Sequence, residues 1–238
     1  MSDRASNLSK SWPTWLGHAD MPAGPAYERG HVPLVVERAK RAADIVGALF
    51  GLLLTAPLWP LVALAITLDS RGPVFYRQMR VGRLWSDRAE LIMIIKFRSM
   101  TADAEARTGA VWARKADARI TRVGRFLRMT RLDELPQLLN VLFGDMSLVG
   151  PRPERPVFYG RLDRQAAFFA DRTLGLRPGV TGLAQIRVGY DGSIEDVKRK
   201  VGYDAAYSMQ LADVRSWIMA DEKIILRTVL VVLTGKGQ

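Results

Sequence analysis

The strongest pattern along the chain is a run without charged residues from Ile45 to Leu68. A straight helix needs about 20 residues to cross a hydrocarbon core about 30 Å thick, so the run is long enough by length alone. Pro57 and Pro60 lie at its centre. A proline inside a helix costs about 3 kcal/mol, and lipid offers nothing to satisfy the carbonyls that it frees. Two prolines three residues apart favour a bend over a straight span.

Positive charge flanks this run on both sides, with Arg38, Lys40 and Arg41 before it and Arg71, Arg77, Arg80 and Arg83 after it. Positive residues close to a membrane segment resist translocation, so both ends prefer the cytoplasmic side. A helix-break-helix hairpin keeps both ends there, with arms of about 12 residues that reach about 18 Å. The alternative, a buried core helix of a soluble protein, is disfavoured by the length of the run.

The pattern after the run shortens and predicts a β-hairpin. Residues 74–81 and 90–98 are rich in β-forming side chains and flank a polar turn at Ser86 and Asp87. Residues 101–118 are charged, small and weakly patterned, which is typical of a mobile loop or a marginal helix next to a site.

Further helices are predicted downstream. A basic helix is expected around five arginines spaced three apart over residues 119–131, of which two or three share a face. Residues 175–192 predict turns around a short strand, and residues 194–213 an amphipathic helix. The apolar residues 223–233 are interrupted by Arg227 and are too short to span, so they predict a core or interfacial helix.

The segment TRLDELPQLLNVLFGDMSLVGPRPERP, residues 130–156, carries the densest pattern. Its four leucines between residues 135 and 142 mark one helical face, Pro136 suits a first turn and Gly144 ends the helix. Asp133 and Glu134 are therefore expected at a helix N-terminus.

An acidic pair at a helix start has a purely structural explanation, because carboxylates favour that end of the helix dipole and Thr130 with Asp133 fits a capping box. Three features favour chemistry instead: arginines just upstream, a rigid GPRPERP turn that presents Arg152 and Arg155, and the membrane segment nearby. A carboxylate can attack phosphorus, and a neighbouring carboxylate can hold Mg²⁺. These parts predict a site where a phosphorylated substrate meets a lipid.

Composition narrows the class of protein. The 238 residues suit one domain, or one domain plus an anchor, and the net charge of +11 favours anionic partners. With no cysteine, disulfides and thiolate metal sites are excluded. Walker and G-x-G-x-x-G motifs are missing, and both histidines lie in the N-terminal leader, which disfavours histidine acid-base catalysis.

The leader itself, residues 1–36, is expected to be flexible and to lack a cleaved signal. Trp12, Trp15 and Leu16 could enter a membrane interface, although a disordered tail is the simpler interpretation. The hairpin segment is assigned to residues 37–70 and a cytoplasmic catalytic domain to residues 71–238.

These motifs together resemble the bacterial sugar transferases, the monotopic phosphoglycosyl transferases that start exopolysaccharide and O-antigen repeat units. The resemblance runs from about Glu37 to Gly237 and rests on three motifs besides the broken apolar helix. They are KFRSM at residues 96–100, LDELPQLLNVLFGDMSLVGPRPE at residues 132–154 and RPGVTGLAQI at residues 177–186. The stretch IRVGYDGSIEDVKRK is most similar to the exopolysaccharide-type members.

The resemblance implies a reaction and assigns residues to it. Asp133 would take a sugar phosphate from a UDP-sugar, releasing UMP, and pass it to undecaprenyl phosphate, and Glu134 would bind Mg²⁺. Lys96, Arg128 and Arg152 would bind phosphate, whereas Arg177 and Gln185 are weaker candidates for the substrate pocket. The family's re-entrant membrane helix bends at a proline that corresponds to Pro57.

Two departures from the family pattern stand out. Many members carry serine before the bending proline, where this chain has Ala56, so a hydroxyl that helps the bend is expected to be missing. The aromatic run that follows a Tyr-Asp pair becomes YDAAYSMQ at residues 203–210, which weakens any sugar-contacting role there.

The resulting expectation is an α/β fold, mostly helical with a small β-hairpin, in a monotopic enzyme on the cytoplasmic face of the bacterial inner membrane. Its partners would be a UDP-sugar, undecaprenyl phosphate and membrane lipids, not nucleic acid. Two alternatives stay open: a glycosyltransferase that moves the sugar alone and releases UDP, and a non-enzymatic basic membrane scaffold. The sugar, the pathway, a homo-oligomer and the role of the leader are left open.

Overall fold

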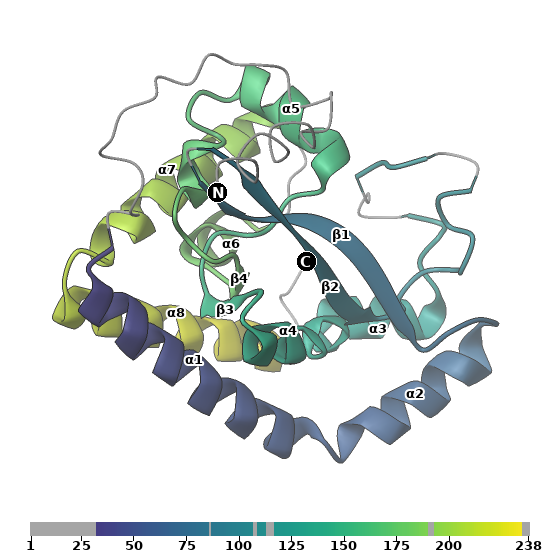
Figure 1. Cartoon of the computed structure of the whole chain (residues 1–238). Coiled ribbons are helices and arrows are strands. Elements are labelled where there is room, and N and C mark those ends of the chain that lie inside the picture. Colours follow the sequence, from purple (N-terminus) through teal and green to yellow (C-terminus); the bar gives the residue numbers. More distant parts are fainter. Residues whose placement is uncertain (1–31, 86, 107–108, 113–116, 190–192, 235–238) are drawn as a thin grey trace, which may run out of the picture.

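A computed structural model describes residues 32–234 except for 86, 107–108, 113–116 and 190–192 (Figure 1). Most of the predicted leader, including Trp12, Trp15 and Leu16, lies outside the described residues, as does Ser86 of the predicted turn. The described elements, in chain order, are α1 (Leu34–Thr55), α2 (Leu58–Asp69), β1 (Phe75–Leu84), β2 (Ala89–Phe97), α3 (Arg122–Met129), the 3₁₀ turn η3 (Leu132–Glu134), α4 (Gln137–Phe143), β3 (Ser147–Val149), α5 (Pro156–Gln165), the 3₁₀ turn η4 (Asp171–Thr173), β4 (Gly179–Thr181), α6 (Leu183–Val188), α7 (Ile194–Gln210) and α8 (Val214–Thr234).

The architecture is mostly helical with two small sheets among the described residues, which agrees with the predicted fold class. Strands β1 and β2 form the expected antiparallel hairpin, in which Tyr76 pairs with Lys96. The short strand predicted within residues 175–192 is β4, but its parallel pairing with β3, and β3 itself, were not predicted. Helices α5 and α6 were also missed, because each is short and its sequence is dominated by turn-forming Pro and Gly nearby.

Helices α1 and α2 meet at a bend of 63° and form a wide V along one edge of the molecule (Figure 1). Helix α1 ends at Thr55 and α2 begins after Pro57, so the predicted break at Pro57 is confirmed. Pro60 lies in the first turn of α2, where the missing N–H has no helical partner anyway. No single helix of the described chain is long and apolar enough to cross a bilayer, whereas the bent pair together satisfies both criteria.

A hydroxyl is present at this bend, contrary to the expectation from Ala56. Thr55 Oγ1 donates a hydrogen bond to Gly51 O at 2.7 Å, and Trp59 Nε1 donates to Thr55 Oγ1 at 3.3 Å. The hydroxyl of Thr55 therefore shares the carbonyl of the residue four positions earlier with the backbone hydrogen bonds of α1, an arrangement that often bends helices. The hydroxyl has moved by one residue from the position where the family pattern places it.

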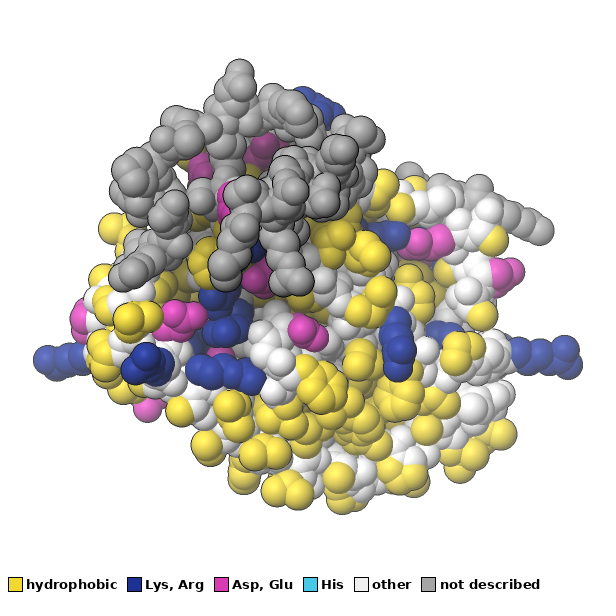
Figure 2. All heavy atoms as spheres, in the orientation of Figure 1, with side chains coloured by type: hydrophobic (Ala, Val, Ile, Leu, Met, Phe, Trp, Pro, Cys, Tyr) yellow, Lys and Arg dark blue, Asp and Glu magenta, His cyan; other side chains and the backbone are white. Residues whose placement is uncertain are grey.

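The two arms of the V differ in length and surroundings. Helix α1 has 22 residues, not about 12, because it begins well before the apolar run, and its first half packs on the rest of the chain through the buried residues Val36 and Asp44. Its second half and α2 leave large apolar side chains exposed, among them Leu53 and Leu68, at 76% and 78%. Figure 2 shows hydrophobic side chains gathered along this edge of the molecule.

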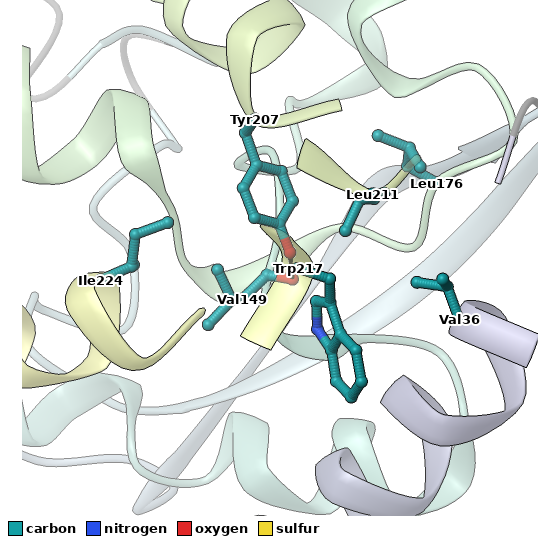
Figure 3. Packing of buried hydrophobic residues seen from close by; sticks show 7 residues of the cluster. All are labelled: Val36, Val149, Leu176, Tyr207, Leu211, Trp217 and Ile224. Carbon is teal, nitrogen blue, oxygen red and sulfur yellow. Dashed lines mark hydrogen bonds between the residues drawn. The ribbon is translucent and has the colours of Figure 1, made fainter. Parts of the chain in front are cut away.

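A hydrophobic cluster joins α1 to the C-terminal helices (Figure 3). It consists of Val36, Val149, Leu176, Tyr207, Leu211, Trp217 and Ile224. Partly buried polar groups reinforce it, since Asp221 accepts hydrogen bonds from Lys40 Nζ, Tyr207 OH and Trp217 Nε1, at 2.7, 2.8 and 2.8 Å. The C-terminal helix is thus a core helix on one side, whereas Leu226 and Leu230 on it are exposed.

Helix α4 is tied to the outer edge of β2 by one side chain. Asn140 is buried, its Oδ1 accepts from Ile95 N at 3.0 Å, and its Nδ2 donates to Met93 O at 2.9 Å. The edge of a two-stranded sheet leaves backbone groups unpaired, and the amide takes the place of a third strand. Gly144 then ends α4 at a positive φ of 92°, as the sequence predicts, so that the chain turns into β3.

We expect Asn140→Leu to lower the free energy of unfolding by about 2 to 3 kcal/mol, because it leaves Ile95 N and Met93 O without their partners. Denaturant unfolding followed by tryptophan fluorescence would measure the change. Gln165→Leu, which removes an exposed amide at the end of α5, is the matched control and should change stability by less than about 0.5 kcal/mol. Equal stability of the two variants would contradict the role assigned to Asn140.

Candidate active site

A cavity of about 350 Å³ lies between the β-hairpin, the 3₁₀ turn η3 and the turn that follows β3. Five of the residues predicted for the site line it together: Lys96, Arg128, Asp133, Glu134 and Arg152. They come from four different parts of the chain, so the fold and not sequence proximity brings them together. Aromatic side chains, including Tyr76, Trp112 and Phe158, line other parts of the wall.

The acidic pair lies in the 3₁₀ turn η3, which ends at Glu134, shortly before α4 begins at Gln137, and not in the helix itself. Arg131 precedes this turn with φ +60° and ψ 10°, a left-handed conformation that a non-glycine residue adopts at a cost of about 1 kcal/mol or more. Thr130 Oγ1 donates to Phe126 O at 2.9 Å and so ends α3. The capping-box interpretation of Thr130 and Asp133 was therefore wrong.

Glu134 is buried and surrounded by cations. Its Oε1 accepts from Lys96 Nζ and from Arg152 Nη2, both at 2.9 Å, and Arg131 Nη1 lies 3.6 Å from Oε2. Burial alone would raise the pKa of this carboxyl, but Arg152, Lys96 and Arg131 together outweigh it and hold the pKa well below its usual range. Glu134 is thus a fixed negative charge.

Asp133 is equally buried, yet its pKa moves in the opposite direction, to about 6. Burial is the largest cause, the charge of Glu134 adds to it, and Lys96, Arg128 and Arg131 only partly offset the two. The fold thus favours the protonated form of Asp133 and the ionised form of Glu134, so the two adjacent carboxyls differ in how readily they hold a proton.

The cations of the cavity are also desolvated. Burial lowers the pKa of Lys96, which Glu134 partly restores. Arg128 Nε is buried and has no hydrogen-bond partner among the described residues. An unpartnered buried donor carries a free-energy cost that an anionic ligand would remove.

Arg80 also lines the cavity, although from the sequence it was expected only as a positive charge that flanks the apolar run. Burial lowers its pKa to about 10, and its Nη1 donates to Pro153 O at 3.1 Å. Alternate residues of a strand point to the same face, so Tyr76, Gln78 and Arg80 on β1 all line the cavity. Tyr76 pairs with Lys96, which places this face of β1 beside a predicted site residue. The pairing register that would have revealed this was not fixed by the sequence.

Arg177 and Gln185, the two weaker candidates, lie away from this cavity. Arg177 Nε donates to Gly144 O at 3.0 Å, and Arg177 lines a second cavity of about 450 Å³ with Glu37 and Arg83. Gln185 is buried on α6, and its Nε2 has no partner among the described residues. Neither residue is among the described residues that line the cavity with Lys96 and Asp133.

The donor set of the cavity fits a magnesium ion bound together with a phosphorylated substrate. Among the described residues no three Asp, Glu, His or Cys side chains gather in one place, so an all-protein metal cage is not formed there. Mg²⁺ needs only one or two carboxylates when substrate phosphates supply other oxygens. Asp133 and Glu134 provide that number on the cavity wall.

A desolvated acidic pair surrounded by fixed cations is typical of enzymes that act on phosphorylated substrates. The comparison with known families agrees: the chain belongs to the bacterial sugar transferases, whose family model matches residues 35–235. The resemblance inferred from the sequence motifs is confirmed.

Individual relatives carry more specific names. The chain is 41% identical over 198 residues to the UDP-N-acetylgalactosamine-undecaprenyl-phosphate N-acetylgalactosaminephosphotransferase of Aeromonas hydrophila, a match that covers 83% of this chain and 44% of the relative. It is 42% identical over 210 residues to the UDP-glucose:undecaprenyl-phosphate glucose-1-phosphate transferase of Caulobacter vibrioides, covering 86% and 74%. It is 41% identical over 204 residues to the exopolysaccharide production protein PSS of Rhizobium leguminosarum, covering 83% and 97%. The chain thus spans less than half of the first of these relatives and nearly all of the last.

The opposite pKa shifts predict opposite effects of two isosteric substitutions on stability. Folding raises the pKa of Asp133 from 3.8 to about 6, so stability falls as the pH rises through this window. Asp133→Asn should abolish that fall and raise the free energy of unfolding at pH 7.5 by on the order of 2 to 3 kcal/mol. Glu134→Gln should lower stability at the same pH, because ionised Glu134 is favoured by the fold.

Thermal unfolding of the two variants and the wild type at pH 4 and pH 7.5 measures both effects. At pH 4 the gain of Asp133→Asn should nearly vanish, since the wild-type carboxyl then keeps its proton in the folded state. A loss of stability in Asp133→Asn at pH 7.5 would show that the charge assignment of the pair is wrong.

Proposed function

We propose that this chain transfers a sugar 1-phosphate from a UDP-sugar to undecaprenyl phosphate through a covalent phospho-Asp133 intermediate, as the first membrane step of exopolysaccharide or glycoconjugate synthesis. The observation that carries the proposal is the buried acidic pair in which only Asp133 has a raised pKa, set among cations in one cavity. The names of the relatives, which are sugar phosphotransferases acting on undecaprenyl phosphate, support the substrates.

The reaction has two displacements at one phosphorus. A carboxylate oxygen of Asp133 attacks the phosphorus that carries the sugar, the bond from this phosphorus to the bridging oxygen breaks, and UMP leaves with the electron pair. An oxygen of undecaprenyl phosphate then attacks the same phosphorus, the bond to Asp133 breaks, and the carboxylate is regenerated. Splitting the transfer in this way replaces one difficult step by two easier ones.

The surrounding residues stabilise charge during both displacements. Lys96, Arg128 and Arg152 line the cavity around Asp133 and would bind the diphosphate oxygens, and Arg80 adds a fourth cation. Preorganised charges of this kind lower the barrier because they need no reorganisation when the transition state forms. Glu134, together with the substrate phosphates, would hold Mg²⁺, which supplies further neutralisation of phosphate charge when bound.

The bent helices give the lipid substrate a route to this cavity. The proposal places α1 and α2 as a re-entrant hairpin in the cytoplasmic leaflet, with the rest of the chain on the cytoplasmic face. The exposed apolar side chains of both arms support it, because such a surface is unfavourable in water. Helices α2 and α3 also pack together through Leu127 and Ile66, which keeps the hairpin beside η3.

The released nucleotide tests the reaction. With detergent-solubilised full-length chain, undecaprenyl phosphate and a panel of UDP-sugars, we expect UMP release from at least one donor. Asp133→Asn should reduce this release by about 10³-fold or more, because the nucleophile is lost. Without lipid acceptor the wild type should release up to one equivalent of UMP and retain the sugar phosphate on the protein.

Arg199→Lys, an exposed change on α7, is the control and should keep full activity. Release of UDP in place of UMP would show a glycosyltransferase that moves the sugar alone. Near-normal UMP release by a folded Asp133→Asn variant would exclude the covalent intermediate.

The membrane arrangement makes a separate prediction. Accessibility reporters fused before residue 1 and after residue 238 should both be found in the cytoplasm, because positive charge flanks the hairpin on each side. Reporters on opposite sides of the membrane would exclude the re-entrant arrangement and leave the two displacements untouched.

A further inference from the structure

The backbone of the turn that carries Arg152 is held by hydrogen bonds from three other parts of the chain. Pro151 and Pro153 restrict two of its φ angles, and four consecutive carbonyls accept hydrogen bonds from other parts of the chain. The donors are Gly179 N to Pro151 O at 2.9 Å, Arg172 Nη1 and Nη2 to Arg152 O at 3.3 and 3.2 Å, Arg80 Nη1 to Pro153 O at 3.1 Å, and Val81 N to Glu154 O at 2.8 Å.

The contact to Arg152 O is unusual because it comes from a buried ion pair. Arg172 Nη1 donates to Asp204 Oδ2 at 2.9 Å, and the two residues are 7% and 2% exposed. The guanidinium also lies over the ring of Phe169, with its carbon 4.4 Å from the ring centroid. Neither Arg172 nor Asp204 is among the described residues that line the cavity.

We propose that Arg172 and Asp204 are positioning residues for the active site, acting through the backbone of Arg152. Asp204 on α7 orients the guanidinium of Arg172, and the two terminal nitrogens of that guanidinium fix Arg152 O. The side chain of Arg152 can then reach Glu134 Oε1 at 2.9 Å and, if the proposed function holds, the phosphates of the donor.

Stability alone is a weak explanation of this pair. Two buried charges lose their hydration, and replacing such a pair with apolar side chains of similar volume is often neutral or stabilising. The planar guanidinium of Arg172, in contrast, is well suited to holding two acceptors in a fixed relation, here the carboxylate of Asp204 and the carbonyl of Arg152. A shift of about 1 Å in a catalytic group can lower the rate by as much as 10²-fold. Holding the carbonyl of Arg152 in place would therefore keep the side chain of Arg152 in the position that the reaction needs.

The test compares Arg172→Lys with Arg199→Lys in the full-length chain. Lysine keeps the charge beside Asp204, but a single ammonium cannot reproduce the fork that also binds Arg152 O. We expect Arg172→Lys to remain folded, with Tm close to that of the wild type, and to lower kcat for UMP release by about tenfold. Arg199→Lys should be unchanged in both respects.

A double-mutant cycle with Arg152→Ala separates positioning from a general effect. If Arg172 acts through Arg152, the double variant should be no less active than Arg152→Ala alone, within about twofold. Independent, multiplicative losses would overturn the proposal, as would an Arg172→Lys variant that is folded and fully active.

A second pair of substitutions covers the case in which Arg172→Lys fails to fold. Arg172→Met combined with Asp204→Leu removes both buried charges and should fold, because no unpaired charge remains. It should show the same tenfold loss of kcat and the same non-additivity with Arg152→Ala. Wild-type activity in this double variant would overturn the positioning role.

Binding of UDP, measured by calorimetry in detergent, gives a readout that does not depend on turnover. Arg172→Lys should weaken UDP binding severalfold in the wild-type background and not at all in the Arg152→Ala background. Absence of UMP release by the wild type would contradict the proposed function, while this cycle would still decide the role of Arg172. Equal weakening in the two backgrounds would overturn the positioning role.

Discussion

The attachment of α4 to the free edge of β2 is the contact on which the rest of the site depends. A two-stranded hairpin presents unpaired backbone groups along each outer edge, and Asn140 satisfies two of them with one amide. Lys96 lies one residue beyond Ile95 on that strand, and η3 comes just before α4 in the chain. By joining α4 to β2, the amide helps to place the acidic pair beside Lys96, which forms an ion pair with Glu134.

Two neighbouring carboxyls with the same burial acquire opposite character from the placement of a few cations. Glu134 has Lys96 and Arg152 within hydrogen-bond distance of a single oxygen, so its charge is favoured despite desolvation. For Asp133, burial and the like charge of Glu134 raise the pKa, and Lys96, Arg128 and Arg131 only partly offset them. Two adjacent positions thus differ in charge behaviour, and no histidine is among the described residues of the cavity wall.

Features with short-range causes were predictable from the sequence. The bend at Pro57, the hairpin before residue 98 and the end of α4 at Gly144 each follow from a few neighbouring residues. The site residues Lys96, Arg128, Asp133, Glu134 and Arg152 were found through motifs, and the fold does bring them together. The position of Arg80 required the pairing register of the strands, and the hydrogen bond of Thr55 required the helix geometry. Arg172 and Asp204 lie 32 residues apart and meet only in the tertiary structure.

The first half of α1 is part of the folded core, although its second half leaves large apolar side chains exposed. The carboxylate of Asp44 accepts hydrogen bonds from Ser147 Oγ and Leu148 N, at 3.0 and 2.9 Å, and the guanidinium of Arg41 donates to the last carbonyls of α4. One continuous helix therefore joins the apolar bend to the strand that precedes the Arg152 turn. Removing the residues before 71 would therefore remove contacts of β3 and α4 together with the apolar bend, and helices α1 and α2 taken from a relative would have to bring matching partners for both.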